Sequence, residues 1–185
     1  MVDLLQIIEN LVAAISPGGG GLTGLLFIMS WIIGLVLVMM AIKAASRRSE
    51  MGKNVGSWSG PAWSLIIGVC FVALPGLMAS LTQTFFGVDS TDPADIFSYA
   101  PSTVGLFDED SAGRNMITGI VVVIQFFGAI AIMRGLLLLR ETANGGGGGP
   151  KTFGPGFTHV IAGSMAANFP LFVGVVEWVI TNGAT

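Results

Sequence analysis

The stretch RGLLLLRETANGGGGGPKTFGP, residues 134–155, lies between two apolar segments and decides how the chain folds. It combines the cations Arg134, Arg140 and Lys151 with a run of five glycines, and the segment that follows contains Asn168-Phe169-Pro170. Glycine and proline at this density end helices and form turns. A basic, glycine-rich turn between two apolar segments therefore predicts a helical hairpin.

A similar stretch occurs earlier in the chain. Lys43, Arg47, Arg48 and Lys53 end an apolar segment, and Ser59-Gly60-Pro61 opens the next one, which contains Leu74-Pro75. Pro155 follows Pro61 by 94 residues, and Pro170 follows Pro75 by 95. The similar spacing predicts one helical hairpin that is repeated in tandem. Two copies are too few to form the stacked core of a solenoid, which excludes that fold.

The composition indicates a membrane protein. Of the 185 residues, 52% are hydrophobic and 10% are charged, whereas an average soluble domain has about 25% charged residues. The mean hydropathy is +0.80, and a soluble fold of this size could not cover its surface with so few charges. The net charge of −3 identifies no class of partner, so the positions of the charges are more informative than their sum.

Four apolar segments are long enough to cross a bilayer core of ~30 Å, which takes about 20 helical residues. They are residues 22–42, 62–86, 116–139 and 157–180. Residues 2–15 have apolar side chains at three- and four-residue spacing, which predicts an amphipathic helix that lies in the membrane interface or packs against the spans. We therefore expect an all-α membrane protein with four transmembrane helices in two tandem hairpins, which form a parallel repeat, plus an N-terminal amphipathic helix.

This expectation divides the chain into four regions. They are an amphipathic helix and glycine-rich linker (1–21), a first hairpin (22–86) with its basic turn at 43–60, an acidic loop (87–113), and a second hairpin (114–185) with its turn at 140–155. The loop contains six carboxylates, and its Pro93 and Pro101 argue against a long helix there.

The basic residues predict the topology. Both turns are rich in Lys and Arg, whereas the two ends of the chain have none and the acidic loop has only Arg114 at its edge. By the positive-inside rule both turns are cytoplasmic, and the termini and the acidic loop are external. The two halves then have the same orientation, which argues against a transporter built from inverted halves.

Four residues predict breaks within the spans: Pro75 and Gly76 in the second span, and Asn168 and Pro170 in the fourth. Proline lacks a backbone donor, so a membrane helix kinks there and neighbouring groups satisfy the freed carbonyl. Close helix contacts are expected at three pairs of small residues: Gly76 and Ser80, Ala131 and Gly135, and Gly163 and Ala167. Such pairs favour self-assembly.

No motif in the sequence indicates catalysis or a metal site. The run from Gly145 to Thr152 differs from a phosphate-binding loop, because Pro150 replaces the required sixth-position glycine and offers no N–H. His159 is the only histidine, and its segment supplies no further metal donors. The acidic loop does not match the spacing of a calcium-binding loop. We therefore expect no metal, and we expect no sequence-specific binding of nucleic acid.

Several motifs resemble one protein family. They are Gly60-Pro61 before Leu65-Ile66-Ile67-Gly68, Leu74-Pro75, Gln83-Thr84-Phe85-Phe86-Gly87, Arg134-Gly135, Thr152-Phe153-Gly154, and Thr158-His159-Val160-Ile161-Ala162-Gly163. Together they are similar to the IcmC/DotE-type proteins of Dot/Icm secretion systems and to relatives encoded on conjugative plasmids with type IVB machinery. The resemblance covers residues 22–180. It implies a non-enzymatic subunit in the bacterial inner membrane, with other subunits of the transfer apparatus as partners.

Each half also resembles a VirB-type conjugative pilin in its layout of two apolar helices, a basic cytoplasmic turn and external ends. Such pilins assemble into helical tubes and hold phospholipid head groups near the basic turn. This resemblance implies that copies of the chain assemble with one another, that membrane phospholipid binds in place of a cofactor, and that the polymerised form is an extracellular filament. The residues expected at a lipid phosphate or at the lumen are Lys43, Arg47, Arg48, Arg134, Arg140 and Lys151.

Two questions stay open at the level of sequence. The subunit is either a static inner-membrane component or a pilin-like one that polymerises. The alternative function is a small inner-membrane channel or transporter subunit, because Arg134 and Asn168 are polar groups at membrane depth. Arg134 also has a simpler interpretation, in which its long side chain extends to the lipid head groups.

Overall fold

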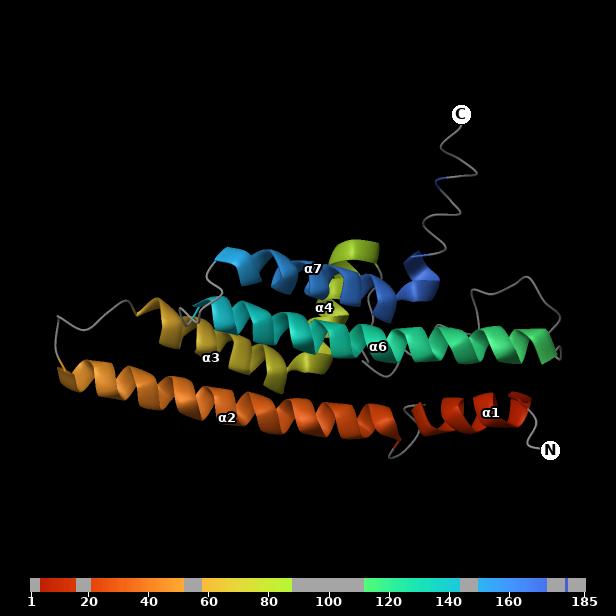
Figure 1. Cartoon of the computed structure of the whole chain (residues 1–185), viewed down its shortest axis with the longest axis horizontal. Helices are drawn as coiled ribbons and strands as arrows, with labels where there is room; N and C mark the ends of the chain where they lie inside the picture. Colours follow the sequence, from red (N-terminus) through yellow and green to blue (C-terminus); the bar gives the residue numbers. More distant parts are fainter. Residues whose placement is uncertain are drawn as a thin grey trace. The chain divides into compact units, whose positions relative to one another are not determined.

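The computed structural model describes residues 4–15, 21–51, 58–87, 112–143, 150–172 and 179. In this part of the chain the regular structure is helical and no strand occurs. The helices are α1 (Leu4–Ile15), α2 (Leu22–Met51), α3 (Ser59–Val72), α4 (Leu74–Phe86), α6 (Ala112–Ala143) and α7 (Pro150–Ala167), in that order (Figure 1). The predicted all-α class is therefore confirmed.

Two described helices are long and apolar enough to cross a membrane. They are Leu22–Glu50, with 29 residues, and Gly119–Ala143, with 25 residues. A third candidate is the pair Ser59–Val72 and Leu74–Phe86, if this bent pair counts as one span. The described part of the chain thus contains two or three candidate spans, whereas four were predicted. Residues 173–178 and 180 of the fourth predicted span lie outside the described residues.

The chain divides into two compact units. Unit 1 comprises Met1–Leu25, Met78–Ile130 and Gly163–Thr185, and unit 2 comprises Leu26–Leu77 and Ala131–Ala162. Each unit takes segments from both predicted hairpins, so contacts between distant parts of the sequence define it.

Helix α1 packs within unit 1. Its last residue, Ile15, is buried in an apolar cluster with Val121 and Val122 of α6, and Phe169 packs against this cluster. The hydroxyl of Thr23 donates a hydrogen bond to the carbonyl oxygen of Ile15. This bond satisfies one of the carbonyls that the end of a helix leaves without a partner.

Helices α2 and α3 approach each other closely at two glycines in unit 2. A methyl group placed on Gly34 would lie 2.8 Å from the carbonyl oxygen of Gly68 and 2.6 Å from the backbone nitrogen of Val72. A methyl group on Gly68 would lie 2.9 Å from a side-chain carbon of Val38. Small residues at such a contact let helix backbones pack without intervening side chains. The contacts also show that the two helices run antiparallel.

Helices α6 and α7 are paired in the same way. In unit 1, a methyl group on Gly128 would lie 2.7 Å from the carbonyl oxygen of Gly163. In unit 2, one on Gly135 would lie 2.7 Å from the carbonyl oxygen of Gly156 and 2.8 Å from the backbone nitrogen of Val160. Glycines therefore set the separation of this antiparallel pair in both units.

The contacts of Gly34 and Gly128 correspond at two backbone atoms. Each glycine faces the carbonyl oxygen of a second glycine, Gly68 or Gly163, and the backbone nitrogen of the residue four positions after it. Gly128 follows Gly34 by 94 residues, and Gly163 follows Gly68 by 95. The spacing that relates the prolines of the two halves thus also relates their closest helix contacts.

Candidate functional site

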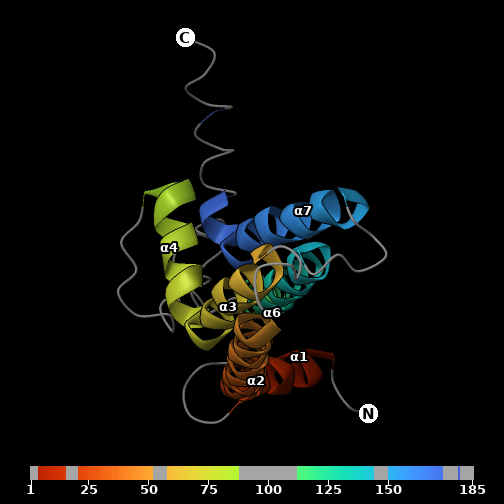
Figure 2. The same cartoon turned by 90° about the vertical axis from the view of Figure 1, so that its left-hand side faces the viewer.

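The first feature of the candidate site is the sharp bend between α3 and α4. The two helices meet at 90°, and only Ala73 separates them, with φ −99° and ψ 29° in place of helical values near −63° and −42°. Helical hydrogen bonds continue on both sides, from Ala73 N–H to Val69 O at 2.9 Å and from Leu77 N–H to Ala73 O at 2.8 Å. A single residue, two positions before Pro75, therefore makes the bend (Figure 2).

A serine from α2 compensates for the proline after this bend. Pro75 has no N–H, so the carbonyl of Phe71, four residues earlier, lacks its helical donor. Within unit 2 the hydroxyl of Ser30 donates to that carbonyl oxygen at 2.7 Å, and Ser30 is fully buried. In a membrane, a carbonyl freed by proline needs such a partner because lipid offers no donor.

The second half of the chain breaks at the corresponding residue. Helix α7 ends at Ala167, Asn168 forms a turn, and residues 169–172 are helical again. Asn168 N–H donates to Ser164 O at 3.1 Å, and Phe172 N–H donates to Asn168 O at 3.0 Å. Asn168 follows Ala73 by 95 residues and likewise lies two positions before a proline, Pro170. Both breaks thus have the same position and the same pattern of backbone hydrogen bonds.

The side chain of Asn168 connects α7 to α4 within unit 1. The hydroxyl of Thr82 donates to Asn168 Oδ1 at 2.9 Å, and Asn168 Nδ2 donates to the carbonyl oxygen of Ser164 at 2.9 Å. Thr82 is 0% exposed and Asn168 is 3% exposed. The Thr82 hydroxyl also lies 3.0 Å from the carbonyl oxygen of Met78, so its single proton is shared between two acceptors. Asn168 therefore both caps its own helix and accepts a bond from another.

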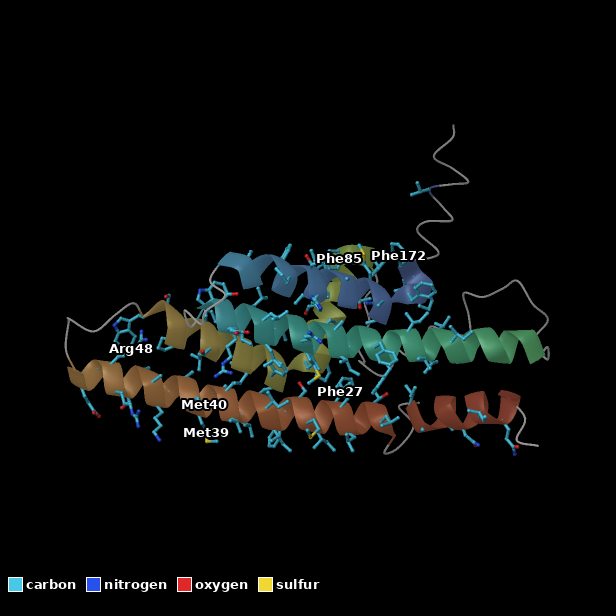
Figure 3. The ribbon with its side chains drawn as sticks, in the orientation of Figure 1. Phe27, Met39, Met40, Arg48, Phe85 and Phe172 are labelled. Carbon is cyan, nitrogen blue, oxygen red and sulfur yellow. The ribbon has the colours of Figure 1, made fainter. Side chains whose placement is uncertain are left out.

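The six basic residues expected at a lipid phosphate or lumen all belong to unit 2. Lys43 and Arg47 on α2 and Arg134 on α6 are exposed, whereas Arg48 (Figure 3) and Arg140 are half-buried. The Nε atom of Arg140 is buried and has no hydrogen-bond partner among the described residues. The side chain of Lys151 lies outside the described part. The exposed cations leave unit 2 with basic groups that an anion can reach.

Unit 2 also exposes four aromatic side chains that the sequence interpretation missed. Trp58 and Trp63 at the start of α3 are 58% and 50% exposed, and Phe153 and Phe157 at the start of α7 are 54% and 52% exposed. The two phenylalanine rings are stacked, with their centroids 6.2 Å apart. Phe153 follows Trp58 by 95 residues and Phe157 follows Trp63 by 94, so the repeat spacing could have identified them. Aromatic residues beside basic ones are typical of a membrane interface.

Two of the three small-residue pairs contribute to packing within the chain. Gly135 and Gly163 lie at the contacts between α6 and α7, whereas Gly76 is exposed and an added methyl group there would meet nothing within 4 Å. Two of these pairs thus serve intrachain packing and do not argue for self-assembly.

Chemistry beyond packing is sparse in the described part of the chain. His159 is half-buried, and its Nδ1 lies 2.7 Å from the carbonyl oxygen of Pro155 in the same helix. Among the described residues no group of three or more His, Cys, Asp and Glu side chains could hold a metal ion.

No protein-family model, curated protein or solved structure matches this chain.

Proposed function

We propose that this chain is a non-enzymatic structural subunit of a bacterial type IVB-like secretion or conjugative transfer apparatus, built as one helical hairpin repeated in tandem in the inner membrane. The observation that carries the proposal is the recurrence of glycine contacts and helix breaks at a spacing of 94 or 95 residues. Two apolar helices joined by a basic turn form the layout of a conjugative pilin. The motifs that resemble IcmC/DotE-type proteins indicate the type IVB branch of this machinery.

In this proposal the two basic turns are cytoplasmic, and the termini and acidic loop are periplasmic. The exposed cations Lys43 and Arg47 and the exposed Trp58 and Trp63 support this orientation, since all four belong to unit 2. Basic residues are retained on the cytoplasmic side, and aromatic side chains anchor helices at the level of the head groups. The start of α7 has the same combination, with Phe153 and Phe157 close in sequence to Lys151.

Copies of the chain and membrane phospholipid are the proposed partners, together with other subunits of the apparatus. Six basic residues bind lipid phosphates or line a lumen: Lys43, Arg47, Arg48, Arg134, Arg140 and Lys151. The guanidinium of the half-buried Arg140 is suited to a phosphate because charge-assisted bonds of arginine to phosphate are strong. Polymerisation would turn the inserted subunit into an extracellular filament.

Electron microscopy and mass spectrometry of filaments sheared from transfer-competent cells test this proposal. We expect filaments that contain this chain, and we expect deletion of its gene to abolish transfer until the gene is restored. If transfer needs the chain but sheared filaments never contain it, the subunit is a static membrane component. If transfer proceeds normally after deletion, the proposed function is wrong.

A channel or transporter subunit is the second candidate, because Arg134 is an exposed cation inside the candidate span Gly119–Ala143. Ion flux into liposomes that contain the purified chain tests this function. If the chain conducts ions, the Arg134→Gln variant should lose this flux. The Glu141→Gln variant should keep it, because the carboxylate of Glu141 is exposed near the end of the same helix. The structural proposal predicts no flux above that of empty liposomes in either case.

A further inference from the structure

Helix α4 has one buried face and one exposed face. Leu74, Met78 and Thr82 are 0%, 1% and 0% exposed, whereas Gly76, Ser80 and Gln83 are exposed. The helix ends at Phe86, and the next residue, Gly87, has a φ of 67°, which suits glycine after a helix C-terminus. Its buried face combines two apolar anchors with one polar anchor.

The direction of α4 decides whether this part of the chain can cross a membrane. Helix α3 alone has 14 residues, which rise only about 21 Å, whereas a bilayer core is ~30 Å thick. A straight helix over residues 59–86 would be about 42 Å long. With the bend at Ala73, neither α3 nor α4, with 14 and 13 residues, is long enough to cross the core on its own.

The hydrogen bond between Thr82 and Asn168 is well placed to fix α4 against α7 within unit 1. Thr82 lies nine residues after Ala73, which corresponds to about 13 Å along the helix, so an anchor there restrains the far part of α4 relative to α7. Apolar contacts such as those of Leu74 and Met78 have no preferred direction, whereas a hydrogen bond at 2.9 Å requires a defined geometry.

We propose that the Thr82–Asn168 hydrogen bond is a lock that holds α4 in a fixed position against α7 within unit 1. The lock joins α4, which follows the first helix break at Ala73, to Asn168, which forms the equivalent break in the second half. It thereby couples the two halves of the chain within unit 1. This inference does not depend on the secretion role, because it concerns only hydrogen bonds and helix direction.

Double electron–electron resonance, which measures the distribution of distances between two spin labels, tests the lock in the full chain reconstituted in lipid nanodiscs. After Cys70→Ala removes the native thiol, labels at Phe85→Cys on α4 and Met165→Cys on α7 report the position of α4; both residues are exposed and belong to unit 1, and Figure 3 labels Phe85. We expect one narrow distance distribution for this background. Thr82→Val, which removes the hydroxyl, should broaden it at least twofold.

Two variants provide matched controls. Thr84→Val also removes a hydroxyl from α4, but that hydroxyl is exposed and, among the described residues, bonds the carbonyl of Ser80 in its own helix at 2.7 Å; the distribution should stay narrow. Thr82→Ser keeps the donor and should also stay narrow. A second label pair at Phe127→Cys and Met165→Cys reports the pairing of α6 with α7 and should not change in any variant.

The lock is excluded if Thr82→Val leaves the distribution between labels 85 and 165 unchanged. It is also excluded if Thr82→Val broadens both label pairs equally, because general loss of structure is then the cause. The lock is supported if Thr82→Val broadens only the distribution between labels 85 and 165 and Thr82→Ser leaves that distribution narrow.

Discussion

At the scale of single residues, glycine sets how closely the helices pack. Gly128 lies at the point where α6 meets α7 in unit 1, and Gly34 has the equivalent position between α2 and α3 in unit 2. A methyl group at either site would collide with backbone atoms, which cannot move aside as a flexible side chain does. The glycines are therefore required by their neighbours, not by their own backbone conformation.

We expect Gly128→Ala to destabilise the protein by about 1–3 kcal/mol, the typical cost of overpacking. Gly154→Ala is the matched control on α7, because an added methyl group there meets nothing within 4 Å. That change should be neutral or stabilise by up to about 1 kcal/mol, since alanine favours a helix. Unfolding with sodium dodecyl sulfate, followed by circular dichroism, measures both values. Equal effects of the two substitutions would contradict the packing assigned to Gly128.

Ser30 is expected to stabilise the bend through its bond to the carbonyl of Phe71. Ser30→Ala should cost about 1 kcal/mol, as measured for hydrogen bonds between membrane helices. Ser49→Ala serves as the control, because Ser49 is exposed near the end of the same helix. If a Pro75→Ala background, which restores a backbone donor for that carbonyl, retains the full cost of Ser30→Ala, the assigned role of Ser30 is wrong.

At the scale of elements, the bend between α3 and α4 is the largest difference from the sequence-based expectation. Pro75 and Gly76 indicate a kink, because proline removes a donor. The sequence does not reveal that Ala73 makes the turn or that the angle is 90°. Leu74 and Met78 just after the bend are buried, and Ser30, which bonds the carbonyl of Phe71 beside it, is 41 residues away in the chain. Contacts over such separations leave no local pattern in a sequence.

The exposed cations near the end of α2 should bind anionic lipid. Lys43→Gln combined with Arg47→Gln should weaken binding to vesicles that contain phosphatidylglycerol by about fivefold for each charge, since each cation contributes about 1 kcal/mol near an anionic surface. Glu50→Gln, which alters an exposed carboxylate on the same helix, should not weaken it. Sedimentation of nanodisc-bound protein with such vesicles at low salt measures the effect. Equal binding by the double variant would contradict the role assigned to these two residues.

At the scale of the whole molecule, the apolar runs correctly predicted an all-helical fold with long apolar helices. A chain with 10% charged residues has too few charges to cover the surface of a soluble fold. They also located both helices that the structure shows as candidate spans, Leu22–Glu50 and Gly119–Ala143, which overlap the predicted segments 22–42 and 116–139 but end later. The number of spans was harder to predict, since α3 is cut short by its bend and α7 breaks at Asn168. Hydropathy records the apolar character of a segment and not its direction, so a bent segment resembles a straight one.

The repeat spacing was the most informative sequence signal. It was visible in two prolines of each half, and it recurs in the contacts of Gly34 and Gly128 and in the breaks at Ala73 and Asn168. The lock residue Thr82 gave no such signal, because a threonine in an apolar helix is common and its partner Asn168 lies 86 residues away.

The central claim is that the hairpin is repeated in parallel, with both basic turns on one side of the membrane. Single cysteines at Ser49 and Glu141, in a Cys70→Ala background, test it most directly, because both residues are exposed and lie close to the two turns. A membrane-impermeant maleimide added to intact spheroplasts should label neither position until the membrane is opened, and it should label a cysteine at the exposed Asn10 from outside. Labelling of only one of positions 49 and 141 in intact spheroplasts would place the turns on opposite sides and contradict the parallel repeat.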